Sequence, residues 1–157
     1  MKRTCLTITI ELQGDLYRRL LDYAVQECTL ALLVVRPSLH LNATGERVLH
    51  LLAGYLKEKA ESSVWPGTEL LSEVALVYRY HIGPGSVEVL KDAADSLYSW
   101  QQPYLPEDLC LLRTDQEPWL VSIAHERDSY FCLSEDEQTR LLAELPELTS
   151  LLKSEVS

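Results

Sequence analysis

The segment Leu30-Ala31-Leu32-Leu33-Val34-Val35 is an uninterrupted run of apolar residues that ends at Arg36-Pro37. Polar and apolar side chains do not alternate within it, so a strand formed there has no face suited to water. We therefore predict that residues 30–35 form a buried strand inside a sheet, with helices packed over it.

The composition is that of an ordinary soluble globular protein. The chain has 157 residues, of which 46% are hydrophobic and 24% are charged. We expect residues 1–157 to form a single domain that buries its core without covalent links. No apolar run is long enough for a signal peptide or a membrane span, which predicts a cytoplasmic protein.

The first hundred residues alternate between strand and helix patterns. Leu6, Ile8, Ile10 and Leu12 alternate with polar residues, which indicates a half-buried strand. Capping residues and apolar stripes then predict helices between the strands. The predicted strands cover residues 6–12, 30–35 and 70–82, and the predicted helices begin at residue 14, run from 42 to about 59 and from 83 to about 100.

After a loop at residues 101–106 the predicted elements become shorter. Three strands at residues 109–112, 119–124 and 130–133 are typical of an antiparallel meander. Ser134 and Glu137 then form a capping box that begins a C-terminal helix. We predict an α+β fold: a mixed sheet of about six strands with a β-α-β start, a C-terminal antiparallel meander and helices packed on the sheet. The segments 1–100 and 105–157 are its two substructures.

The formal net charge is −10, and much of it lies near the C-terminus. From Asp115 onward there are three basic and ten acidic residues. Such a surface repels a phosphate backbone and an anionic membrane, so we expect neither nucleic acid nor membrane as a partner. It suits a protein partner with a basic surface. The alternative is that the acidic side chains only keep the protein soluble.

The four cysteines and the missing motifs argue against familiar chemistry. Cys5, Cys28, Cys110 and Cys132 contain no Cys-x-x-Cys pair, which favours buried free thiols over a zinc site. The chain also lacks a nucleophile elbow, a P-loop and a Gly-x-Gly-x-x-Gly motif. We therefore expect no cofactor and no bound metal.

The densest group of titratable residues is His125-Glu126-Arg127-Asp128, in a predicted hairpin turn. A histidine beside carboxylates can act as a general base or begin a metal site. A small hydrolase or metal-dependent enzyme would use His125, Glu126 and Asp128, with His81 as a further candidate. The alternative is a turn that is charged for solubility alone.

Several aromatic residues lie in or beside predicted loops, namely Trp65, Trp100, Tyr104 and Trp119. Aromatic side chains ringed by acidic groups such as Glu126 and Asp128 are typical of protein-recognition surfaces. The alternative is a hydrophobic cluster that seals the meander against the first half of the chain.

Two stretches resemble known families. Ile10-Glu11-Leu12-Gln13-Gly14-Asp15-Leu16, the strand at 30–35 and Asn42-Ala43-Thr44-Gly45 resemble the STAS domain of anti-sigma-factor antagonists. That resemblance implies a regulatory switch module with a phosphate acceptor near Thr44, although Ala43 stands where that family has its phosphorylated serine.

Residues 93–100, 105–109 and 124–128 resemble a bacterial family labelled stage III sporulation protein AH, a label that implies no activity. From the charge, the aromatic residues and the missing motifs, we expect a non-catalytic bacterial protein-binding protein. An immunity-type inhibitor or a regulatory adaptor would fit. The enzyme at His125 and the STAS-like switch are the alternatives.

Overall fold

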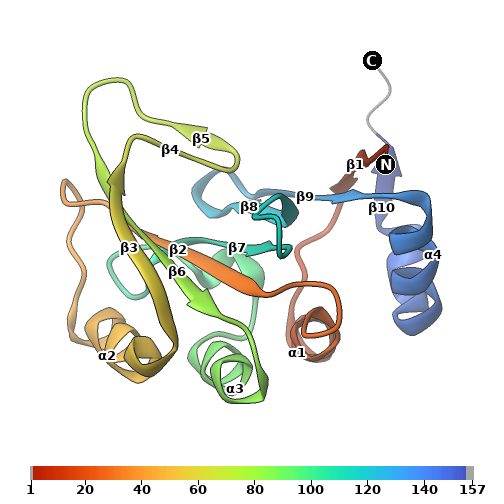
Figure 1. Ribbon diagram of the computed structural model, residues 1–157, viewed down its shortest axis with the longest axis horizontal. Helices are drawn as coiled ribbons and strands as arrows, with labels where there is room; N and C mark the ends of the chain where they lie inside the picture. The colour runs from red at the N-terminus through yellow and green to blue at the C-terminus, as the bar shows by residue number, and fades with distance from the viewer. Residues whose placement is uncertain (1, 155–157) are drawn as a thin grey trace.

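The computed structural model of the chain describes residues 2–154 (Figure 1). Its α-helices are α1 (Gly14–Ala24), α2 (Ala43–Leu52), α3 (Pro84–Ala93) and α4 (Glu135–Glu144). Its strands are β1 (Thr4–Ile8), β2 (Leu30–Val35), β3 (Leu56–Ser62), β4 (Val64–Trp65), β5 (Thr68–Glu69), β6 (Ala75–His81), β7 (Glu107–Leu112), β8 (Pro118–Ile123), β9 (Asp128–Leu133) and β10 (Leu152–Ser154). Short 3₁₀ segments cover Ala53–Tyr55, Leu97–Ser99, Ala124–Glu126 and Pro146–Ser150.

Eight strands form one sheet in the order β10-β1-β9-β8-β7-β2-β6-β3, while β4 and β5 form a separate hairpin. The predicted α+β class, the β-α-β start and the β7-β8-β9 meander are confirmed. The prediction of about six strands is wrong, because the sheet has eight. The prediction of a mixed sheet is also wrong, because every neighbouring pair is antiparallel. The meander lies between β1 and β2, so both halves of the chain build the same sheet.

The strand β2 lies inside the sheet, between β7 and β6, as its sequence predicts. Ala31 and Leu33 belong to the larger core, which also contains Leu20 of α1, Val48 of α2 and Leu90 of α3. Figure 1 shows these three helices on the same side of the sheet. We call this side the helix face.

The opposite side, which we call the hairpin face, has a cover that the sequence did not predict. Leu30, Leu32 and Val34 point there and share a second core with Trp65 of β4. The turn between β4 and β5 is Pro66-Gly67, and Gly67 has φ +87°. Proline followed by glycine with positive φ is the signature of a tight type II turn. Figure 1 shows the hairpin on the side of the sheet away from α1–α3.

The predicted helix at residues 42–59 ends at Leu52, and residues 56–62 form the edge strand β3 instead. Charged residues with good helix propensity fill β3, but pairing with β6 outweighs that weak local preference. Alternating charges are also what protects an exposed sheet edge from pairing with another chain. Similarly, the predicted strand at 70–82 begins only at Ala75.

A C-terminal strand and a disulfide join the ends of the described chain. The strand β10, which the sequence did not predict, pairs with β1, and residues 155–157 lie outside the described residues. Cys5 in β1 and Cys132 in β9 are register partners and form a disulfide, so the prediction of free thiols is wrong for these two residues. It is confirmed for Cys28 and Cys110, which are free and buried. None of the helices within residues 2–154 has the length and apolar character needed to span a membrane.

Candidate functional site

Three of the four predicted aromatic anchors lie in the interior. Trp100 and Trp119 have no exposed surface, and Trp65 is buried under the hairpin. Trp119 packs edge-on against Phe131 with ring centroids 5.1 Å apart. Burial of large aromatic surface stabilises the core, which is the sealing role that the sequence left open. Of the predicted anchors, only Tyr104 is exposed, at 66%.

Tyr104 borders a groove that runs along the helix face. One section, of about 530 Å³, lies beside the cis Gln102-Pro103 peptide and is lined by Tyr98, Tyr104 and Leu105, among others. The next section, of about 440 Å³, lies between α2 and α3. Thr44 and Ala93 line both sections. The two sections are therefore neighbours, and together we call them the α2–α3 groove.

The structure assembles the predicted histidine with different carboxylates from those that the sequence suggested. His125 lies in the 3₁₀ turn after β8, and Asp128 is the first residue of β9. One ligand atom each from Glu107, Asp108 and His125 lie within 4.8 Å of one another. Within residues 2–154 this is the one such set of three, so Glu126, Asp128 and His81 form no metal-ligand set of this kind with His125.

A bulge in β7 explains why two consecutive carboxyl groups share one side of the sheet. Side chains normally alternate along a strand. Glu107 lies opposite Val34, which points to the hairpin face, and the register then shifts before Cys110. Asp108 adopts the left-handed conformation with φ +58°, and its carboxylate reaches Trp65 on the same face. Bulges of this kind redirect side chains and are frequent beside functional sites.

The two carboxyl groups differ in their hydrogen bonds. Asp108 accepts from the backbone N–H of Ala124 at 3.0 Å and from the indole N–H of Trp65 at 3.4 Å. Oε2 of Glu107 is buried and has no hydrogen-bond partner among residues 2–154. Burial, together with the neighbouring Asp108 charge, raises the pKa of Glu107 to about 7, and burial also raises the pKa of Asp108.

Arg36 is a cation that acts on both members of this pair. Its charge lowers the pKa values of Glu107 and Asp108, but less than burial raises them. Its Nη2 lies 2.7 Å from the carboxylate of Glu73. Arg36 and Glu73 are therefore a neutral pair, and the two buried carboxylates keep an excess of negative charge when they ionise.

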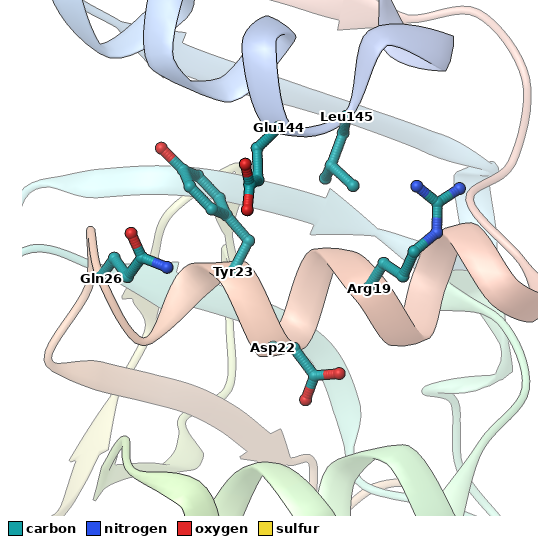
Figure 2. Close-up of a pocket in the computed structure, with 6 residues that line it drawn as sticks. All are labelled: Arg19, Asp22, Tyr23, Gln26, Glu144 and Leu145. Atoms are coloured by element: carbon teal, nitrogen blue, oxygen red, sulfur yellow. The ribbon is translucent and has the colours of Figure 1, made fainter.

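A second hollow lies between α1 and α4 (Figure 2). Arg19 there forms ion pairs with Asp15 and Glu147, and Asp22 points away from the hollow. The neighbouring Tyr23 hydroxyl and Arg140 guanidinium both donate hydrogen bonds to the carboxylate of Glu27. These charged groups are paired with one another, so we assign the hollow a structural role in packing α1 against the C-terminal segment and not a binding role.

Sequence reasoning missed Glu107 and Asp108, which lie directly after Pro106 and resemble ordinary loop residues. The available signal was two consecutive acidic residues at the start of the apolar strand at 109–112, where burying a charge costs free energy.

No protein-family model, curated protein or solved structure matches this chain.

Proposed function

We propose that this protein acts by binding another protein, as an immunity-type inhibitor or a regulatory adaptor, and that the α2–α3 groove is its docking site. The observation that carries the proposal is the exposed apolar lining of that groove. Leu51 and Tyr104 are 45% and 66% exposed, and Val89 and Ala93, which also line the groove, are half-buried.

The dimensions of the groove suit a segment of a protein. Its two sections measure about 440 and 530 Å³ and meet at Thr44 and Ala93. An amphipathic helix placed in an apolar groove uses anchors on one of its faces. Tyr104 lies in one section of the groove, and Leu51 of α2 lies in the other. Each is suited to contact one such anchor.

The charge of the protein favours a basic partner. The lining of the groove contains the carboxylates of Glu88 and Asp92 beside the guanidinium of Arg47. The whole chain carries a net charge of −10. Opposite charges speed association and exclude acidic competitors, so the expected occupant is an amphipathic segment with Lys or Arg along its polar edges.

Site-specific photo-crosslinking tests this proposal. A photoreactive phenylalanine analogue at position 51 or 104, in the full-length protein inside its native cells, should crosslink to the same partner. Mass spectrometry should place the link in a basic, amphipathic segment. The control position is Thr139, an exposed residue of α4 at the far end of the sheet from α2.

A second measurement uses the partner found in this way. The variants L51D and Y104A should weaken its affinity at least tenfold, because each removes an exposed apolar side chain that contacts the partner. The variant T139D should bind as the parent protein does. Crosslinks equally frequent at Thr139, or an acidic crosslinked segment, would overturn the proposal.

A further inference from the structure

We propose that Glu107, Asp108 and His125 bind a divalent transition-metal ion on the hairpin face. This inference does not depend on the α2–α3 groove. It starts from geometry, because a carboxylate oxygen of Glu107, one of Asp108 and an imidazole nitrogen of His125 all lie within 4.8 Å of one another. Ligands that share an ion at 2.0–2.2 Å lie about 3–4 Å apart, so a small movement of the exposed His125 side chain completes the site.

A second observation points to a ligand at the same place. Glu107 is only 4% exposed, and its Oε2 is buried without a hydrogen-bond partner among residues 2–154. Buried polar atoms in native proteins are almost always paired, and an unpaired one destabilises the fold. A bound cation satisfies this oxygen and offsets the proximity of two carboxylates.

The surroundings of Asp108 orient it for binding. Its two oxygens accept hydrogen bonds from the Ala124 amide and the Trp65 indole, and each oxygen keeps a further lone pair. Hydrogen bonds of this kind fix the direction of a metal ligand and raise affinity. Because Ala124 directly precedes His125, the same bond also holds the turn that presents the imidazole.

The donor set decides the class of metal. Two carboxylates and one imidazole suit zinc, manganese or iron(II), whereas calcium prefers six to eight oxygen ligands and magnesium prefers oxygen and water. Arg36 is neutralised by Glu73, so an ionised Glu107 and Asp108 balance the charge of a dication. The exposed side of His125 leaves room for water to complete the coordination.

Calorimetric titration of the full-length, tag-free protein tests the inference. The protein is treated with EDTA, freed of chelator, and titrated separately with ZnCl₂, MnCl₂ and CaCl₂. We expect one zinc site per chain, with zinc bound at least tenfold more tightly than calcium. The variants E107Q and H125A should weaken zinc binding roughly 10–100-fold or more.

Matched controls separate this site from exposed acids and histidines. The variants E126Q and H81A alter residues of the same types outside the group of three, and they should bind zinc like the parent protein. Because His125 is exposed, H125A keeps the test decisive even if E107Q fails to fold. Absence of zinc binding, equal binding by parent and H125A, or calcium binding as tight as that of zinc would overturn the inference.

Discussion

The indole N–H of Trp100 donates a hydrogen bond to the phenol oxygen of Tyr17 at 3.0 Å, and neither side chain is exposed. The hydroxyl of Tyr17 in turn donates to the backbone carbonyl of Leu90 at 2.9 Å. This buried chain of hydrogen bonds joins α1, α3 and the segment before β7. It satisfies the polar atom of Trp100 inside the core and explains why this tryptophan is not a surface anchor.

Replacing Tyr17 with Phe tests the energetic role of this chain of hydrogen bonds. The variant leaves a buried indole N–H and a buried carbonyl unpaired, which should lower the free energy of unfolding by about 1–3 kcal/mol. Urea unfolding at pH 7, followed by circular dichroism, measures the change. The control is Y104F, which removes the hydroxyl of an exposed tyrosine and should change stability by less than about 0.5 kcal/mol. Equal stabilities of Y17F and Y104F would contradict the assignment.

Arg113 and Glu137 form a two-bonded ion pair in the interior, with N–O distances of 2.6 and 2.7 Å. Burial opposes ionisation of Glu137, but hydrogen bonds from Arg113 and from the Ser134 amide outweigh it and hold the pKa at about 2. A lowered pKa stabilises the fold above the ordinary value near 4.5, and this stabilisation is lost as the pH falls toward 2.

The variant E137Q should therefore lose about 3 kcal/mol at pH 7, where it breaks a buried ion pair. Between pH 7 and pH 3, the free energy of unfolding of the parent protein should fall by about 2 kcal/mol more than that of E137Q. Urea unfolding at both pH values measures this difference. Parallel pH dependence in the two proteins would show that Glu137 has an ordinary pKa.

The disulfide between Cys5 and Cys132 connects residues that are 127 positions apart. Closing so long a loop restricts the unfolded chain, and bonds of this kind typically stabilise by about 2–4 kcal/mol. The double variant C5S/C132S should lose a similar amount in urea unfolding. Reductant should lower the stability of the parent protein and leave the double variant unchanged. A parent protein insensitive to reductant would contradict this prediction.

Trp65 packs the β4–β5 hairpin against the second core, on the hairpin face of the sheet. The variant W65A removes a large buried side chain from the cluster around Val34 and Val121, and it should lower the free energy of unfolding by about 3–5 kcal/mol. The control is L71S, six residues after Trp65, at a position that is 97% exposed. Its effect should stay within about 0.5 kcal/mol. A similar loss in both variants would mean that Trp65 is not the contact that holds the hairpin.

The sequence by itself determined the elements whose signals are local. The apolar run at 30–35 predicted a strand buried on both faces, and its alternate residues do belong to the two cores. The Ser134 capping box begins α4 as expected, because the serine and Glu137 satisfy each other's backbone amides within three residues. Gly83-Pro84 likewise begins α3.

Only the tertiary structure decided the features that depend on pairing between distant segments. The strands β3 and β10 form because β6 and β1 offer them hydrogen-bonding edges, which their own sequences do not reveal. The same sheet brings Cys5 to Cys132, and the bulge at Asp108 turns two consecutive acids toward His125. Such contacts depend on strand register, and register is set by the packing of the whole sheet against its two covers.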